Sequence, residues 1–215
     1  RLVNAPSFRG VTRIVSLQQA VARLGSRRIR DVAVAAAIEA TAFPSCSRSG
    51  DMERLWRHAV GAGLFAKEIA RRLRSNVESA FLCGLLHNVG EAVLLANVAK
   101  IEQQRKRRMA DAALAAVLSE EAPAVAALVA AAWELPSTVR VAMVHHPEWH
   151  AYAAQHPEVA ITALARGLAA WLDGEQQASA VAEHPAVVAL NLYPDDVDAL
   201  MAQGERIGAS LGAAA

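Results

Sequence analysis

Four of the seven histidines lie in or at the end of apolar, helix-like sequence: His58, His87, His145 and His146. Imidazole is the commonest metal ligand among side chains, and it binds in its neutral form. Helices that pack side by side can bring such distant residues to one point, as in the metal sites of helical bundles. Small residues at positions 61–63, just after His58, would let a neighbouring helix approach closely. The pattern therefore predicts a metal site between packed helices.

A second interpretation of the same histidines is purely structural. A lone histidine on an apolar helix is usually a core residue that makes one hydrogen bond, and several of them can coincide by chance. The other three histidines, His150, His156 and His184, stand beside proline, tyrosine or loop-like sequence, so we expect them at the surface. The residue pattern alone leaves the metal site and the coincidence open.

His87 stands in the apolar run FLCGLLHNVGEAVLL, residues 81–95, and Asn88 follows it directly. An aspartate after the histidine would indicate a metal site, because a carboxylate supplies negative charge and can bridge two cations. Asparagine has an oxygen that can bind a metal, but it is neutral and is an implausible bridge between two divalent cations. The run therefore poses two alternatives: a working hydrolase centre, or a fold that has lost its chemistry.

The elements that must position these residues are predicted to be helices. Alanine and leucine dominate the sequence, and no strand-like alternation of apolar and polar residues stands out. Apolar residues from Met52 to Leu73 recur at helical spacing, in a long helix that Asp51 opens. Gly90 is expected to mark a bend between two helices, and Pro123 to begin another. Further helices are predicted over residues 27–43, from residue 111, and over residues 137–146, 157–172 and 195–211.

The composition excludes several classes of partner. The chain has 215 residues and a formal net charge of +1, so no global field would attract nucleic acid or an anionic membrane. The basic stretch QQRKRRMAD, residues 103–111, lacks interleaved aromatic residues and is expected to be solvated. Uncharged stretches such as residues 122–133 are shorter than the roughly 18 residues that span a bilayer. Two cysteines are too few for a disulfide framework, and Cys83 is expected to be a reduced core residue. We expect a cytoplasmic protein without nucleic-acid or membrane contacts.

Short motifs run in order along the chain: RLVNAPSF at 1–8, VSLQQAVARLGSRRIRDVAV at 15–34, WRH at 56–58, GLLHNVG at 84–90, WELP at 133–136 and VHHPE at 144–148. Together they resemble the HDOD domain, the HD-related output domain of bacterial signalling proteins. The resemblance implies an all-α, multi-helix HD-like bundle over residues 46–215, with a small N-terminal helical subdomain over residues 1–45. The family usually has more helix before the position of Arg1, so the chain is expected to be truncated at its start.

The resemblance also implies where a metal site would lie. The parent HD superfamily consists of metal-dependent phosphohydrolases, whose ligands are a His, a His-Asp pair and a distant Asp. His58 matches the first His, and His87 matches the His of the pair. His145 and His146 match a later pair of histidines, which relatives that cleave cyclic dinucleotides use. A divalent metal at this site would be Mn, Fe or Zn, although no cofactor is expected.

Three positions depart from this ligand set. Asn88 stands where the pair has its Asp, and Ala122 stands where relatives carry a further His. No carboxylate is in register near Ala165 and Arg166, where the distant Asp falls, and an arginine there would put a positive charge where a cation should sit. We therefore predict a metal-site remnant without catalytic residues, formed by His58, His87, Asn88, His145 and His146.

Three functions follow from this interpretation. The first, which the resemblance favours, is a non-catalytic regulatory module that acts through contacts with signalling proteins. The second is a metal-dependent phosphohydrolase acting on a nucleotide or a cyclic dinucleotide. The third is the binding of a nucleotide second messenger without turnover, which a deep pocket lined by His87, Asn88 and a nearby arginine would favour. The alanine-rich face of residues 122–132 could also pack against a second copy of the chain.

Overall fold

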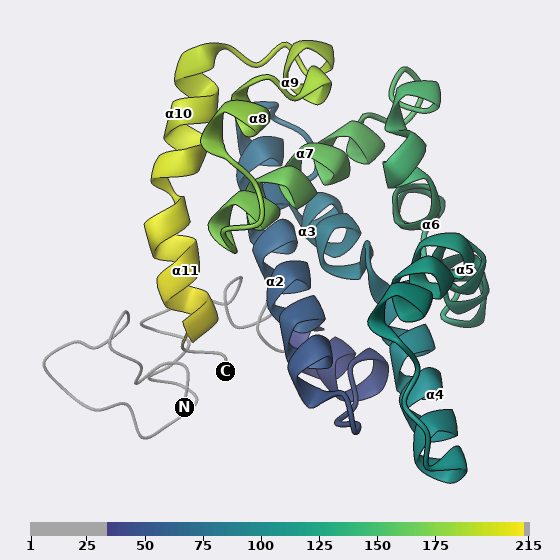
Figure 1. The fold of residues 1–215 in the computed structure, drawn as a ribbon. Helices are drawn as coiled ribbons and strands as arrows, with labels where there is room; N and C mark the ends of the chain where they lie inside the picture. The colour runs from purple at the N-terminus through teal and green to yellow at the C-terminus, as the bar shows by residue number, and fades with distance from the viewer. Residues whose placement is uncertain (1–33, 213–215) are drawn as a thin grey trace, which may run out of the picture.

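The structure, a computed structural model, describes residues 34–212, and the regular elements in this range are all helical (Figure 1). The prediction of an all-α fold is therefore confirmed. The motifs at residues 1–8 and most of 15–34 lie outside the described residues, as does most of the expected N-terminal subdomain. The proposed boundary between residues 45 and 46 stays a prediction.

The long helix α2, Ser49–Arg72, packs against α3, Val77–Leu86, and α7, Pro157–Leu172 (Figure 1). Its expected apolar face is largely buried, because helical spacing brings those residues to the side that meets α3 and α7. The close approach of α2 and α3 depends on Gly84, where a Cβ would lie 2.5 Å from the carbonyl oxygen of Ala62. His58 lies on α2 of this group, and His87 directly follows α3.

A second pair of helices packs beside this group. Helix α4, Val89–Arg105, follows α3 after a break at residues 87–88, two residues before the bend that was predicted at Gly90. Gly90 instead allows α4 to contact α5, Asp111–Ala132, because a Cβ there would lie 2.2 Å from the carbonyl oxygen of Ala122. The glycine is thus needed for a helix contact and not for a bend.

Pro123 lies inside α5 and does not begin a new helix, so the prediction of two helices over residues 111–133 was wrong. Proline removes one hydrogen bond from a helix interior and usually ends or kinks it. Here the alanine-rich sequence on both sides favours helix, and α5 packs against α4 and α6.

Among the remaining elements, α8 and α9 pack against α7, α11 packs against α2, and α6 lies on the other side beside α5 (Figure 1). The helix predicted over residues 195–211 is divided at Gln203 into two nearly continuous helices. The mixed interval of residues 173–192 contains two short helices. The bounds are α6, Ser137–His145; the 3-10 helix η3, His146–Ala151; α8, Ala178–Ala182; α9, Pro185–Ala189; α10, Pro194–Ala202; and α11, Gly204–Gly212.

Two helical runs in the described range are long and apolar enough to cross a membrane, judged by length and composition alone: Val77–Arg105 and α5. In the first, 67% of the most apolar window is buried inside the molecule, as in a core helix. In α5 the buried share is 11%. Two such helices are weak evidence for a membrane span, so the expected lack of membrane contact stays a prediction.

Candidate functional site

Three of the four singled-out histidines come together in space. His58 comes from the middle of α2, His87 follows the last residue of α3, and His146 begins η3. The ring centroid of His87 lies 5.3 Å from that of His58 and 5.3 Å from that of His146. His87 and His146 are buried, with exposed fractions of 4% and 8%. Residues about 90 positions apart thus form one cluster, as the packing of distant helices allows.

His145 does not belong to this cluster. Its ring stacks on that of Tyr152, with the two centroids 4.0 Å apart. Consecutive residues on a helix point about 100° apart around its axis, because one turn takes 3.6 residues. The two adjacent histidines therefore point in different directions, and the structure brings only the second of them into the cluster.

The two buried rings are held in one orientation by backbone carbonyl groups. Nδ1 of His87 donates to the carbonyl oxygen of Gly84 at 2.7 Å. Nδ1 of His146 donates to the carbonyl oxygens of Met143 and Ala142, at 3.2 and 3.3 Å. A carbonyl oxygen only accepts, so Nδ1 carries the hydrogen and Nε2 carries a lone pair in each neutral ring. Both rings therefore present an acceptor nitrogen.

His58 is oriented by a carboxylate that sequence reasoning missed. Nδ1 of His58 lies 3.2 Å from Oδ2 of Asp173, and the guanidinium of Arg57 lies 2.8 Å from Oδ1 of the same residue. Burial alone would raise the pKa of Asp173, but the hydrogen bonds from His58 and Arg57 outweigh burial and lower this pKa. Asp173 lies two helical turns after Arg166, so helical spacing could have indicated it. It stands at the end of α7, beyond the position where the distant Asp was sought.

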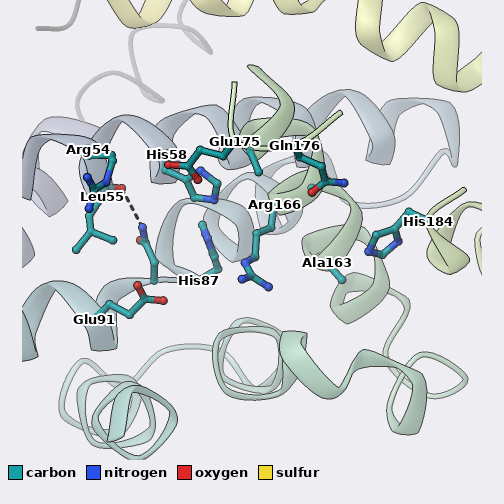
Figure 2. Close-up of a pocket in the computed structure, with 13 residues that line it drawn as sticks. Arg54, Leu55, His58, His87, Glu91, Ala163, Arg166, Glu175, Gln176 and His184 are labelled. Carbon is teal, nitrogen blue, oxygen red and sulfur yellow. Dashed lines mark hydrogen bonds between the residues drawn. The ribbon is translucent and has the colours of Figure 1, made fainter. Parts of the chain in front are cut away.

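Asn88 keeps one unsatisfied polar atom in the site. Its side-chain nitrogen donates to the carbonyl oxygen of Leu55 at 2.9 Å, drawn as a dashed line in Figure 2. The residue is 2% exposed, and its Oδ1 has no hydrogen-bond partner. The Leu55 carbonyl only accepts, so it fixes which end of the amide is the nitrogen. An unpaired buried acceptor costs stability, and it leaves Asn88 ready to accept a hydrogen bond.

His58, His87 and Asn88 line a cavity of about 420 Å³ (Figure 2). Helix α7 contributes Arg166 to its wall, and the chain beyond α7 contributes His184. His184 is half-buried, contrary to the expectation that it would lie at the surface, because the packing of α9 against α7 carries it to the cavity. The other lining residues that the argument uses are His58, His87, Asn88, Arg54, Glu91 and Glu175.

The guanidinium of Arg166 lies beside His87 in this cavity (Figure 2). Burial holds the pKa of His87 well below its ordinary value, and the nearby charges of His146, His58 and Arg166 add to that effect. Burial followed by the charge of Arg166 lowers the pKa of His146 to about 4. Burial also raises the pKa of Glu91, against the opposing influence of Arg166. Burial thus disfavours the charged forms of His87, His146 and Glu91, and the guanidinium groups of Arg54 and Arg166 both line the cavity.

The residues of this cavity do not fit the divalent metal that the resemblance implies. Among residues 34–212, no group of three or more His, Cys, Asp and Glu side chains is arranged to hold a metal ion. Asn88 offers a neutral oxygen where a carboxylate would be required, and the charge of Arg166 opposes a second cation nearby. The arrangement instead offers neutral nitrogen and oxygen acceptors together with the guanidinium groups of Arg54 and Arg166.

Comparison with known sequences places these observations in a family context. The sequence profile of the HDOD domain matches residues 1–149. An uncharacterised protein from Treponema pallidum (strain Nichols) is 28% identical over 186 residues, which make up 81% of this chain and 35% of that protein. The chain therefore spans about a third of the length of this curated relative.

Solved structures share the fold. An HDOD domain protein with unknown function from Geobacter sulfurreducens superposes with a TM-score of 0.74 at 21% identity, covering 98% of this chain and 78% of that one. A candidate metal-dependent phosphohydrolase from Shewanella amazonensis SB2B superposes with a TM-score of 0.68 at 17% identity, with the same coverages of 98% and 78%. At these identities the likeness shows the fold alone.

Proposed function

The chain belongs to the HDOD domain family, and from this premise we propose that it is a non-catalytic regulatory module of bacterial signal transduction that acts through contacts with other proteins. The observation that carries the proposal is that Asn88 and Arg166 line the same cavity. Phosphohydrolases of the HD superfamily depend on a hydroxide that a metal generates near neutral pH. A neutral amide and a guanidinium both disfavour the cation on which that chemistry depends.

The surface of α5 supports a role in protein contacts. Leu128 is 70% exposed, and the exposed residues Ala124, Ala127 and Ala131 lie beside it at helical spacing. The opposite side of α5 packs inward through Ala126. Exposed apolar surface of this kind commonly marks an interaction site. We further propose a cytoplasmic location, which is in line with the free, buried thiol of Cys83.

The test is a hydrolysis assay under conditions that favour a metal enzyme. The purified chain is supplied with Mn²⁺, Fe²⁺ or Zn²⁺ and assayed on bis(4-nitrophenyl) phosphate and on a cyclic dinucleotide. The His58→Ala variant is the control, because this side chain is partly exposed and its removal spares the buried rings. We expect the two proteins to release product at the same background rate. A metal-dependent rate that His58→Ala abolishes would establish the alternative, a metal-dependent phosphohydrolase.

A second candidate function is the binding of a nucleotide second messenger without turnover. The observation that favours it is the cavity of about 420 Å³ in which His87, Asn88 and Arg166 meet. This volume lies in the range of roughly 300–1,000 Å³ that is typical of small-molecule sites. Ligand binding and protein contacts are compatible, because a ligand that prefers one conformation of the module shifts the population that a partner protein meets.

A further inference from the structure

We propose that the protein associates head to tail, with the basic tip of one copy docking on the acidic end of a second copy. The basic tip is residues 100–108, which join α4 to α5, and the acidic end is residues 183–198, from the end of α8 into α10. The inference goes beyond the proposed function, because it concerns contacts between copies of the chain and does not depend on the state of the histidine cavity. Three features carry it: concentrated charge of opposite sign, exposed apolar side chains beside both charges, and the opposite places of the two surfaces in the fold.

The basic tip carries its positive charge unpaired. Residues 100–108 contain five basic residues and one acidic residue, a net charge of +4. The acidic residue, Glu102, is already bound by Arg48 at 2.7 Å. The five basic side chains are exposed, and within residues 34–212 none of them forms an ion pair or a side-chain hydrogen bond. They are Lys100, Arg105, Lys106, Arg107 and Arg108. Their charge is therefore available to a partner.

Hydrogen bonds fix the base of the basic tip, so its charged side chains project from an ordered backbone. Glu102 accepts from the backbone N–H of Met109 at 2.6 Å, and Nη2 of Arg48 donates to the carbonyl oxygen of Met109 at 3.0 Å. The backbone N–H of Arg107 donates to the carbonyl oxygen of Glu102 at 3.2 Å. An ordered loop loses less conformational entropy when it binds. The tip therefore presents its backbone to a partner in one arrangement.

The acidic end has the opposite charge. Residues 183–198 contain four acidic residues and no arginine or lysine. One of the four, Asp196, is paired with Arg72 at 2.7 Å. The other three are exposed, and none of them forms an ion pair in the described part of the chain. They are Glu183, Asp195 and Asp198. An acidic cluster alone identifies no partner, but here the matching basic surface belongs to the same chain.

Exposed apolar side chains lie in both surfaces. Among residues 34–212, four large apolar side chains are exposed, and three of them belong to the basic tip or the acidic end. Ile101 of the tip is 50% exposed, and Val188 and Tyr193 of the acidic end are 78% and 74% exposed. Exposed apolar surface marks interaction sites, and complementary charges orient two partners and speed their encounter. Each surface thus combines apolar contact with a charge that the other surface matches.

The basic tip and the acidic end lie at opposite ends of the molecule, so they meet only between two copies (Figure 1). A surface that binds a different surface of the next copy makes a heterologous contact, which continues as an open chain or closes into a ring. Outside the tip, residues 34–212 contain ten basic and nineteen acidic residues, a net charge of −9. This charge opposes the approach of an extended anion such as a nucleic acid or an anionic membrane, whereas the tip can contact a compact acidic surface. A second copy is therefore the occupant that the charges favour.

The experiment is sedimentation velocity over a range of protein concentrations, in about 0.01 M and about 1 M salt, where charges act over roughly 30 Å and 3 Å. In low salt we expect the parent protein to sediment faster as its concentration rises, and in high salt to sediment closer to the monomer value. The tip variant is Lys106→Glu with Arg107→Glu, and the end variant is Glu183→Lys with Asp198→Lys. Each should raise the dissociation constant at least about tenfold. The control, Arg140→Glu, reverses an exposed arginine of α6 outside both surfaces and should behave like the parent protein.

An equimolar mixture of the two variants identifies which surfaces pair. The end variant keeps an intact basic tip and the tip variant keeps an intact acidic end, so two molecules share one working contact. The two altered surfaces no longer carry opposite charges. We therefore expect the mixture to form dimers and nothing larger, although neither variant associates alone. Circular dichroism of each variant checks that it is folded, as the exposed positions of all four changes lead us to expect.

Each other outcome overturns the proposal at a defined point. A parent protein that stays monomeric in low salt would overturn the association itself, and so would a monomer whose tip binds a phosphatidylserine vesicle or a DNA duplex instead. Association that only the end variant loses would place another basic segment on the acidic end, such as residues 1–33 with their seven arginines. Association that only the tip variant loses would place the tip on a different acidic surface. A mixture that stays monomeric would contradict the pairing of these two surfaces.

Discussion

Replacing His146 with glutamine is expected to make the protein less sensitive to acid. His146 is 8% exposed, and its pKa in the folded chain is lowered to about 4 from an ordinary value of 6.5. A basic group whose pKa is lowered on folding binds its proton more readily in the unfolded chain. Above pH 6.5, the free energy of unfolding therefore does not depend on the protonation of His146. It decreases as the pH falls from 6.5 towards 4.

The magnitude follows from the two pKa values. Each unit of difference corresponds to about 1.4 kcal/mol, so a difference of about 2.5 units makes the parent protein lose roughly 3 kcal/mol between pH 7.5 and pH 4. Glutamine does not titrate, and this share of the loss should be absent in His146→Gln. The contribution of Asp173 is present in both proteins and cancels in the comparison. The pKa of His87 is lowered less in the variant, because the charge of His146 is absent, and this adds to the expected difference.

The assay is urea unfolding followed by tryptophan fluorescence at pH 7.5, 6, 5 and 4. Trp149 is buried and lies close to His146 in the sequence, so its fluorescence reports on this region. The quantity of interest is the free energy of unfolding of each protein relative to its own value at pH 7.5. This normalisation removes the packing cost of the substitution itself. If the two proteins lost stability in parallel over the whole range, His146 could not be a neutral buried group and the reasoning would be refuted.

Three further predictions concern packing, charge and metal affinity. Gly90→Ala would place a Cβ 2.2 Å from a carbonyl oxygen of α5, so we expect the free energy of unfolding in urea to fall by roughly 2 kcal/mol; an unchanged value would show that α4 and α5 can separate freely. Arg48, whose side chain is 1% exposed, bonds Glu102 at 2.7 Å, and Arg48→Met should lower Tm by roughly 5 °C or more in thermal unfolding; a smaller shift would mean that the pair is not needed for stability. The double variant Asn88→Asp with Arg166→Asp should gain a divalent metal in a calorimetric titration with Mn²⁺ or Zn²⁺; a correctly folded variant that binds none would contradict the role given to these two side chains.

The long helices were predictable from local pattern. The expected helix over residues 157–172 matches α7 at both ends, because a proline begins it and apolar residues recur at helical spacing. Local rules were misleading where packing decides the outcome. Pro123 carries a signal for a helix start, yet α5 continues through it, since its alanine-rich sequence favours helix and α5 packs against α4 and α6. Gly90 predicted a bend between two helices, yet in the structure it allows α4 and α5 to come into contact.

The site could be predicted only in part. His58, His87 and His146 were singled out by residue type and apolar context, and the structure brings them together. Asp173 was missed although it lies two helical turns after Arg166, because the carboxylate was sought nearer Arg166. His184 was missed because it reaches the cavity through the chain path beyond α7, which no local pattern describes. The unpaired Oδ1 of Asn88 was equally invisible in the sequence, since it depends on which atoms surround the amide.

The most direct test of the central claim, that this site has lost its metal chemistry, is the metal content of the purified protein. The chain is stripped by mild chelation, loaded with manganese, iron or zinc, and measured by elemental analysis beside His58→Ala. We predict that the parent protein retains no more metal than the variant, because neither Asn88 nor Arg166 supports a divalent cation. One or more metal ions per chain in the parent protein, lost in His58→Ala, would contradict the account.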